Sequence, residues 1–424
     1  MTSTAFASVD DWLVYLESLH PTAIELGLER VATVRDRMGL HPAFPVITVG
    51  GTNGKGSVCA FMATILTAAG YRVGCYTSPH LLRYHERVSV DLQAIDDDAL
   101  MHSFEAVERG RGETPLTYFE FGTLVAMQHF VSRQVDVAIL EVGLGGRLDA
   151  VNVFEPDCAV VVSVDLDHQV YLGDDREQIG FEKAGIFRAG KPALCADVNP
   201  PQRLLDHAKA IGADLQLIGK DFGFTRQELQ WAFWGRQGKH LSLPFPALRG
   251  AYQLGNACAA LAALDELRAL LPVGVGDIKR GLLQVDWPGR FQVMPGRPAV
   301  VLDVGHNPHA ARALVASLKT MGYFEHSYAV FAMLGDKDID SVVEIVKDQF
   351  DHWFVGSLQG PRTITASALA EVLARHNVAG KVSIHDSVAE AYRAACDKAG
   401  ENDRIAAFGS FYTVADVLQA RRAR

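Results

Sequence analysis

A glycine-rich stretch at residues 51–57, which reads GTNGKGS, has the residue types that hold phosphate. It follows a short β-branched run, residues 45–49, and precedes an apolar helical pattern that starts near residue 55. In a strand–loop–helix unit, glycines let the backbone approach an anion, and the N–H groups and dipole of the helix start favour negative charge. We therefore expect Lys55 to neutralise the β and γ phosphates of a nucleotide and Ser57 to face a magnesium ion.

The spacing differs from the common phosphate-loop pattern G-x-x-x-x-G-K-[ST], because Gly56 stands between Lys55 and Ser57. A glycine turn that serves only the packing of strand on helix is the structural alternative. The Lys, the Ser and the preceding strand together favour phosphate binding.

An acidic residue and a histidine follow two further apolar runs. Glu141 directly follows the apolar residues 135–140, and His168 comes shortly after the apolar residues 158–164. The carboxyl ends of parallel strands meet at the edge of the sheet where α/β folds bind ligands. A carboxylate there suits magnesium, which prefers hard oxygen ligands. Imidazole is an unusual ligand for it, so the residues alone favour His168 as an ordinary loop histidine.

Lys183 lies within a helical pattern over residues 176–187, among apolar and acidic neighbours. A lone lysine on a helix is usually a surface side chain whose stem lies along apolar groups. A second motif, residues 139–146, combines a strand, an acidic residue and G-x-G, as in binders of dinucleotides or S-adenosylmethionine. No amphipathic helix follows it, since residues 147–156 have no such pattern, and this rival function is disfavoured.

The elements that must position these residues alternate along the chain. Apolar runs at residues 45–49, 71–77, 135–142, 158–164 and 192–195 are separated by helical patterns, and residues 221–245 suggest a β-hairpin. The alternation restarts after a Pro/Gly-rich stretch near Pro295, with runs at 299–303, 327–333, 352–355 and 404–408. The fold class is therefore α/β. We predict a P-loop-containing parallel-sheet domain over residues 1–295 and a smaller Rossmann-like α/β domain over residues 296–424.

Composition narrows the class of protein. The chain has 424 residues, 49% of them hydrophobic and 21% charged, with a formal net charge of −10 and no basic run. This profile is typical of a folded globular protein and argues against nucleic acid or a membrane surface as a partner. Six scattered cysteines without a CxxC pair indicate buried thiols in a reducing compartment. With no signal-peptide pattern and no long apolar run, we expect a cytoplasmic location.

Several motifs, in order, resemble the Mur ligase superfamily and, within it, the bacterial bifunctional dihydrofolate synthase/folylpolyglutamate synthases. Besides the loop at 51–57, they are residues 77–81 with 86–88, residues 141–150, 167–168, 182–186 and 303–308. The resemblance extends from about residue 10 to 420. It implies an ATP-dependent acid–amino-acid ligase of folate biosynthesis and one-carbon metabolism.

The resemblance also implies roles for individual residues. Magnesium would be held at Ser78, Glu141 and His168, with a second ion at a carbamylated Lys183 and a monovalent cation as a further option. Catalytic roles fall to Lys55, Lys183 and His306. The ATP-binding positions are Thr52, Asn53, Gly54, Lys55, Gly56, Ser57, Asn256, Arg290 and Asp303. Helix capping by Asp303 and Asn307 is a structural alternative for that part of the site.

A pterin site is implied for three segments: Glu25, Leu26 and Gly27; Thr117, Tyr118, Phe119 and Glu120; and Leu148, Asp149 and Ala150. Ser410 is a further substrate-binding position. Tyr118 and Phe119 begin an apolar helical pattern, so a core role is the alternative for them.

The implied reaction transfers the γ-phosphoryl group of ATP to the carboxylate of dihydropteroate or of a folate, and L-glutamate then attacks the acyl phosphate. We expect these small molecules as partners of a monomer, with no nucleic acid and no membrane. A monofunctional folylpolyglutamate synthase is the nearest alternative. A Mur-type peptidoglycan ligase and a P-loop NTPase switch are less favoured.

Overall fold

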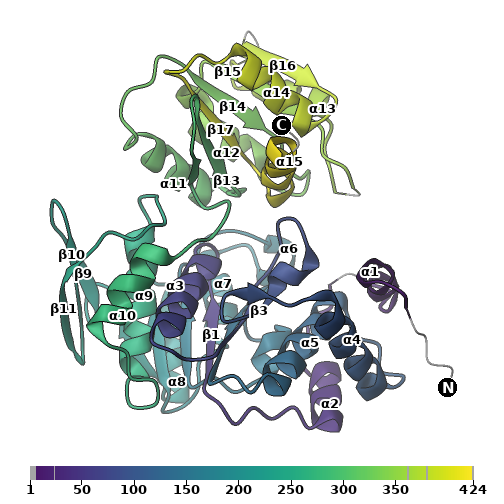
Figure 1. The fold of residues 1–424 in the computed structure, drawn as a ribbon, viewed down its shortest axis with the longest axis vertical. Helices are drawn as coiled ribbons and strands as arrows, with labels where there is room; N and C mark the ends of the chain where they lie inside the picture. The colour runs from purple at the N-terminus through teal and green to yellow at the C-terminus, as the bar shows by residue number, and fades with distance from the viewer. Residues whose placement is uncertain (1–5, 23, 361, 379–380, 423–424) are drawn as a thin grey trace. The chain divides into compact units, whose positions relative to one another are not determined.

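An eight-stranded sheet forms the centre of the first of two compact units in the computed structural model, which describes residues 6–22, 24–360, 362–378 and 381–422 (Figure 1). The strand order is β4-β3-β2-β5-β1-β6-β7-β8. The bounds are β1 (Val46–Gly50), β2 (Val73–Tyr76), β3 (Val88–Val90), β4 (Gln93–Ala94), β5 (Val137–Glu141), β6 (Cys158–Val161), β7 (Pro192–Cys195) and β8 (Asp214–Leu217). All neighbouring strands pair in parallel except β3 and β4, which form an antiparallel edge.

The register of the central strands explains where the polar residues end up. Val49 of β1 pairs with Glu141 of β5 on one side and with Val160 of β6 on the other. Every residue of β1 and β5 is buried, as expected for strands covered by helices on both faces. The carboxyl ends of β1, β5 and β6 therefore meet at one edge, and the loops that follow them start there.

Helices of the first unit precede, connect or follow these strands. They are α1 (Val9–Ser18), α2 (Glu29–Met38), α3 (Lys55–Ala68), α4 (Asp97–Arg111), α5 (Tyr118–Ser132), α6 (Gln169–Leu172), α7 (Arg176–Ala184), α8 (Gln202–Ile211), α9 (Gln253–Glu266) and α10 (Val275–Gln284), with 3-10 turns η1 (Tyr84–Arg87) and η2 (Ala150–Val153). Helix α3 is buried almost all round, which its uniform apolar sequence requires. None of the helices in the described ranges is both long and apolar enough to cross a lipid bilayer.

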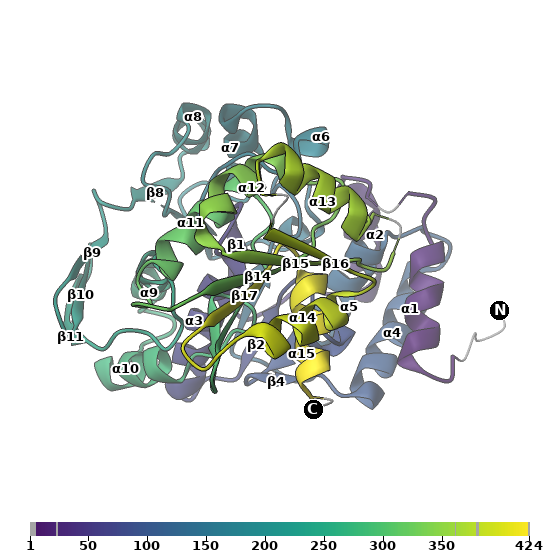
Figure 2. The same cartoon turned by 90° about the horizontal axis from the view of Figure 1, so that it is seen from above.

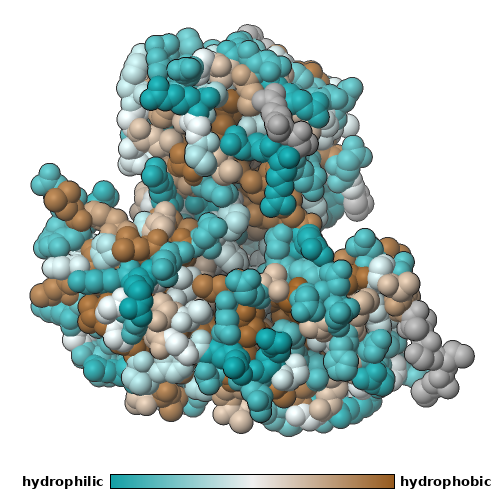
Figure 3. All heavy atoms as spheres, viewed as in Figure 1, coloured by the Kyte–Doolittle hydropathy of each residue, from teal (hydrophilic) through white to brown (hydrophobic). Residues whose placement is uncertain are grey.

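Residues 221–245 form three strands, whereas the sequence predicts a β-hairpin, which has two. Strands β9 (Gly223–Arg226), β10 (Trp231–Gly235) and β11 (Gly238–Leu243) make a three-stranded antiparallel sheet, with β10 in the middle. The prediction missed β9 because only its first residue is buried and no alternation marks it. Hydrophobic residues remain visible on this sheet in Figure 3, in keeping with the exposure of Phe224, Leu229 and Leu241.

The second unit is built on a six-stranded sheet of order β12-β13-β17-β14-β15-β16, parallel except for β12. The strands are β12 (Gln292–Met294), β13 (Ala299–Asp303), β14 (Ser327–Phe331), β15 (His352–Gly356), β16 (Val382–His385) and β17 (Arg404–Phe408). The helices are α11 (Pro308–Leu318), α12 (Ile339–Val346), α13 (Ala366–Arg375), α14 (Val388–Lys398) and α15 (Phe411–Arg422), with a 3-10 turn η3 (Lys347–Gln349). Figure 2 shows α11, α12 and α13 on one side of this sheet and α14 and α15 on the other. The predicted α/β class with parallel sheets is confirmed.

The first unit comprises Met1–Pro246 and Leu254–Val285, and the second comprises Ala247–Gln253 and Asp286–Arg424. The boundary predicted near Pro295 thus lies nine residues beyond Asp286, inside the second unit. The six cysteines are free thiols, five of them buried.

Candidate functional site

The phosphate loop connects the end of β1 to the start of α3. Gly54 precedes the helix with φ +89°, and a Cβ placed on it would lie 2.7 Å from Asn256 Oδ1 and 2.8 Å from Val162 Cγ1. Gly51 also has a positive φ of +144°. Glycine is therefore required for both conformation and space at Gly54. The same contact brings Asn256, a predicted ATP-binding residue of α9, against the loop.

Lys55 folds back over the loop that precedes it. Its Nζ donates hydrogen bonds to Gly51 O at 3.0 Å and to Thr52 O at 3.3 Å. Ser57 is fully buried in the first turn of α3. The loop thus presents an ammonium group beside the helix N-terminus, and this combination favours phosphate.

The phosphate loop is bonded to the loop that follows β6. Thr52 N donates to Ser163 O at 2.8 Å, and Asn53 N donates to Ser163 Oγ at 3.0 Å. Thr52 Oγ1 donates to Asp165 O and accepts from Asp165 N, both at 3.0 Å. Ser163 was not among the predicted site residues, because it lies inside the apolar run 158–164 and only the structure shows that β6 ends at Val161.

Glu141 and Ser78 are brought together at the carboxyl edge of the sheet. Glu141 is buried at the end of β5, and its Oε2 accepts a hydrogen bond from Ser78 N at 3.0 Å. A buried carboxylate beside a hydroxyl-bearing residue offers hard oxygen ligands, which fit a divalent metal. No cluster of three His, Cys, Asp or Glu side chains suited to a metal occurs in the described part of the chain.

His168 directly precedes helix α6 and has a left-handed backbone conformation, with φ +53°. Its Nε2 lies 3.9 Å from Asp167 Oδ1, and its side chain is partly exposed. Such a backbone conformation is uncommon outside glycine, and it often marks functional loops. A metal-holding role for His168 remains a prediction.

Lys183 is buried near the end of α7, so the alternative of a surface lysine is wrong. Burial, followed by the positive charge of Lys55, lowers the pKa of Lys183 to about 7, while Asp167 and Asp149 act in the opposite direction. The glycine-rich loop after β5 packs directly on this end of α7, because a Cβ on Gly146 would lie 2.9 Å from Lys183 O. The helix end and the loop therefore fix the position of the amine together.

Asp149 is buried in the same loop. Burial raises the pKa of Asp149 to about 7, although hydrogen bonds from Leu144 N at 2.7 Å and Val151 N at 3.1 Å favour its charged form. The carboxyl group thus titrates near neutral pH and can either donate or accept a hydrogen bond there.

The three segments predicted to contact a pterin meet in the first unit. Gly27 N donates to Leu148 O at 3.3 Å, which joins the first segment to the third. Phe119 lies against the glycine loop, since a Cβ on Gly143 would meet its ring at 2.6 Å. Tyr118 is only partly buried and lies beneath the guanidinium of Arg87, whose Cζ is 5.4 Å from the ring centre. Neither aromatic ring is wholly enclosed in the core, unlike their neighbour Phe121.

The remaining predicted residues belong to the second unit. Asp303 is buried and accepts from Gly305 N at 2.7 Å and Phe291 N at 2.9 Å, and burial raises its pKa. Its capping alternative is wrong, because Asn307 alone caps α11 through Ala310 N.

Three further predicted residues of that unit, Arg290, His306 and Ser410, lie around Phe411 at the start of α15. The guanidinium of Arg290 lies over the ring of Phe411, with Cζ 4.8 Å from the ring centre. The ring of His306 is 6.4 Å from that of Phe411. Ser410 Oγ accepts from Thr413 N at 3.0 Å and so caps α15. Arg290, His306 and Ser410 thus all lie near the start of this helix.

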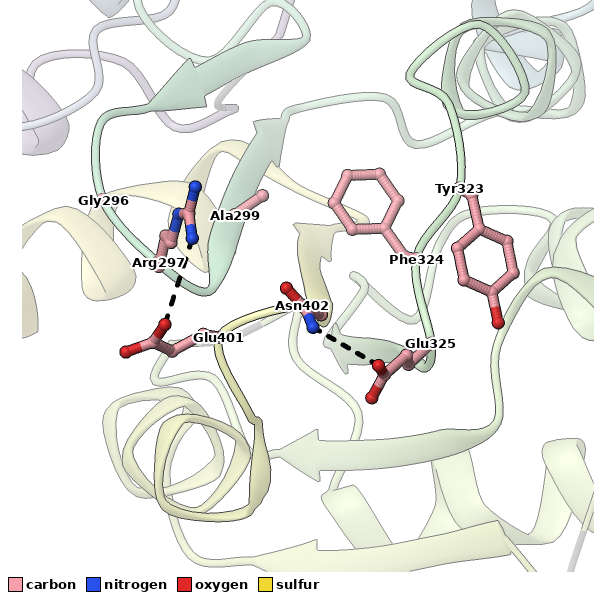
Figure 4. Close-up of a pocket in the computed structure, with 8 residues that line it drawn as sticks. All are labelled: Gly296, Arg297, Ala299, Tyr323, Phe324, Glu325, Glu401 and Asn402. Carbon is pink, nitrogen blue, oxygen red and sulfur yellow. Dashed lines mark hydrogen bonds and ion pairs between the residues drawn. The ribbon is translucent and has the colours of Figure 1, made fainter.

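A separate pocket of about 380 Å³ opens in the second unit (Figure 4). It is lined by Gly296, Arg297, Ala299, Tyr323, Phe324, Glu325, Glu401 and Asn402. Figure 4 shows an ion pair between Arg297 and Glu401 and a hydrogen bond between Asn402 and Glu325 across it. These residues precede β13, β14 and β17, so the pocket lies at the amino ends of the strands. By contrast, Asp303, His306 and Ser410 lie at or directly after the carboxyl ends of β13 and β17.

Comparison with known proteins agrees with this arrangement. Residues 49–264 match the model of the Mur ligase middle domain, and residues 289–411 match that of the Mur ligase glutamate ligase domain. The dihydrofolate synthase/folylpolyglutamate synthase of Escherichia coli K12 is 45% identical over 100% of this chain and 98% of its own.

Solved structures are similarly close. Escherichia coli FolC in complex with DHPP and ADP has a TM-score of 0.93 at 45% identity, covering 99% of this chain and 98% of the other. A bifunctional folylpolyglutamate synthase/dihydrofolate synthase with Mn, AMPPNP and L-glutamate bound has a TM-score of 0.91 at 43% identity, covering 100% and 99%.

Proposed function

The chain belongs to the Mur ligase family, as a ligase of its dihydrofolate synthase/folylpolyglutamate synthase group, and we propose that it joins L-glutamate to dihydropteroate and adds further glutamates to folates. The observation that carries this proposal is the gathering of three features in the first unit: the phosphate loop, the Glu141–Ser78 edge and the buried Lys183 amine. A phosphate loop alone would fit many NTPases.

ATP with a divalent metal is the activating substrate, and we propose that the metal is Mg²⁺. Glu141, Ser78 and His168 would hold one ion, and a carbamate on Lys183 would hold a second. A bound divalent ion neutralises phosphate charge and orients the transferred group. The monovalent cation stays a prediction, for which no residue is proposed.

The residues of the chain have separable tasks in this proposal. Lys55 and the N–H groups at the start of α3 bind the phosphates, together with Thr52, Asn53, Gly54, Gly56 and Ser57. The second-unit residues Arg290, Asp303, His306 and Ser410 bind nucleotide or glutamate. The γ-phosphoryl group moves to the substrate carboxylate, the amine of glutamate then attacks the acyl phosphate, and inorganic phosphate leaves. Positioning and charge neutralisation supply most of the rate in such transfers.

Lys183 is suited to carbamylation because the reaction needs a neutral amine. The amine nitrogen adds to CO₂, one proton is released, and the product is a carbamate anion. A pKa of about 7 leaves much of the amine neutral at physiological pH. The free thiols favour a reducing, cytoplasmic setting, and we propose a monomer that acts on small molecules alone.

Phosphate release tests the function directly. With ATP present, we expect release to require both dihydropteroate and L-glutamate, and a second round to require a folate and L-glutamate. The variant Lys55→Ala serves as the matched inactive control. Equal release with ATP alone would overturn the ligase proposal. Release with tetrahydrofolate but never with dihydropteroate would identify a monofunctional folylpolyglutamate synthase.

A further inference from the structure

Arg30, at the start of α2, bonds to two of the segments predicted to contact the pterin. Its Nη2 donates to Glu25 O and to Glu120 Oε1, both at 3.1 Å, and its Nη1 also pairs with the Glu25 carboxylate. Its Nε reaches Glu120 Oε2 at 3.4 Å. One guanidinium therefore joins the loop before α2 to the first turn of α5.

Both carboxylate oxygens of Glu120 accept hydrogen bonds from other groups of the protein. It is 3% exposed, and its Oε2 also accepts from Thr117 N at 2.8 Å, which completes a capping box with Thr117 Oγ1. A buried carboxylate needs such partners, since a buried charge without them is costly. The carboxylate therefore fixes Arg30 and the start of α5.

Apart from Arg30, the loop at residues 24–28 is held by a contact of Glu25 Oε2 with His20 Nε2 at 3.4 Å and by packing of Leu28 against the core. It contains no helix or strand, and none of its residues is buried. Gly27 N donates a hydrogen bond to Leu148 O, and this bond links the loop to the third predicted segment. Burial acts to lower the pKa of Arg30, but the carboxylates of Glu120 and Glu25 outweigh it and raise the pKa, so the cation persists at all working pH values.

We propose that Arg30 is a positioning residue, with Glu120 as its buried anchor. It holds residues 25–27 against the start of α5 and thereby sets the affinity for the pteroate-bearing substrate. This inference rests on the proposed function. It assigns Glu120 a role through Arg30 in place of direct contact with the substrate.

The chain offers a matched control for the loss of a partly buried arginine that makes a two-pronged ion pair. Arg111 donates to both oxygens of Glu108 at 2.6 Å and to Tyr15 Oη at 2.6 Å, and so joins α4 to α1 in the same unit. The side chains of Arg30 and Arg111 are 22% and 11% exposed. The two ion pairs therefore share their chemistry and both arginines are partly buried, although the side chain of Glu108 is more exposed than that of Glu120, at 23% against 4%. Of the two arginines, only Arg30 contacts the predicted pterin segments.

The test compares Arg30→Met, Arg30→Lys and Arg111→Met in steady-state ligation. For Arg30→Met we expect the KM for dihydropteroate to rise about tenfold or more, with kcat and the KM values for ATP and glutamate within about twofold. Arg30→Lys keeps the positive charge but loses the two-pronged geometry of the guanidinium, so its KM for dihydropteroate should rise less than that of Arg30→Met. Arg111→Met should lower the thermal midpoint without changing any KM.

Three results would overturn the proposal. They are an equal KM rise in Arg111→Met, a fall in kcat without a KM change in both Arg30 variants, and additive effects of Arg30→Met and Glu120→Gln in the double variant. If Arg30→Met does not fold, Arg30→Lys alone decides, because an unchanged KM in that variant also overturns it. Failure of the wild-type chain to ligate dihydropteroate would instead remove the proposed function.

Discussion

At the scale of single residues, the proposed function depends most on Lys183. The side chain is buried beside a second lysine, Lys55, and both effects disfavour its protonated form. From sequence this residue looked like an ordinary surface lysine, because one helical lysine among acidic neighbours carries no sign of burial. The packing of the glycine loop on α7 supplies the missing information.

Replacing Lys183 by Ala should abolish ligation, with a loss of about 100-fold or more, if its carbamate holds a metal ion. A short carboxylic acid such as acetate should restore part of the activity of Lys183→Ala by supplying the lost carboxylate. Lys183→Arg, which cannot form the carbamate, is the control and should not respond to acetate. Wild-type activity in Lys183→Ala would dismiss the carbamate.

Lys183 should also destabilise the apoprotein near neutral pH. Its folded pKa of about 7 lies below the ordinary lysine pKa of 10.5, so the unfolded chain binds the extra proton between these values and stability rises with pH across that window. Lys183→Met should therefore be more stable than wild type at pH 7, by a few kcal/mol at most, and the gap should shrink toward pH 10. Denaturant titrations without CO₂ at both pH values measure it. A gap that grows with pH would contradict the assignment.

At the scale of elements, the phosphate loop is fixed by backbone conformation as much as by charge. Gly54 needs a positive φ and has no room for a Cβ, whereas Gly70, after α3, has a similar φ of +93° with no atom near its Cβ position. Substitution of Gly70 therefore measures the cost of the backbone conformation alone, and substitution of Gly54 measures that cost together with the cost of a steric clash.

Gly70→Ala should lower stability by about 1–2 kcal/mol, because it places Ala in the left-handed region, and Gly54→Ala should lower stability further because its methyl group also clashes. Only Gly54→Ala should also weaken nucleotide binding, since the added methyl displaces Asn256 or the loop itself. Calorimetric titration with ADP, alongside thermal melts, measures both. Equal ADP affinity in the two variants would mean that the Gly54 contact does not shape the nucleotide site.

At the scale of the whole molecule, each of the two units has its own sheet and its own buried core. Leu124 of α5 and Leu373 of α13 are both fully buried, one in each unit. They allow the same truncation to be made in either core.

Scanning calorimetry should therefore resolve two unfolding transitions. Leu124→Ala should lower the transition of the first unit and Leu373→Ala that of the second, because a buried Leu→Ala change costs about 2–5 kcal/mol. The wild-type scan under the same conditions is the control. A single transition lowered by both variants would show that the units unfold together.

The sequence predicted the parts of the molecule that local patterns encode. The α/β class, the central strands and the phosphate loop follow from apolar runs and glycine spacing. Sequence patterns gave no signal for elements whose structure depends on contacts between residues far apart in the chain. Strand β16, whose residues are at most partly buried, has no apolar run, and β12 is only three residues long. The Arg30–Glu120 pair joins positions 90 residues apart, so no local spacing could indicate it.

The hydrogen bonds of Thr52 and Asn53 to Ser163 and Asp165 have a consequence for protein engineering. The two loops share their backbone partners, so neither conformation is specified by its own sequence alone. A phosphate loop transplanted from a distant family member should therefore work only when its companion loop after β6 is transplanted with it. Directed evolution of nucleotide preference would best randomise both segments in one library, because beneficial changes in one will depend on the residue present in the other.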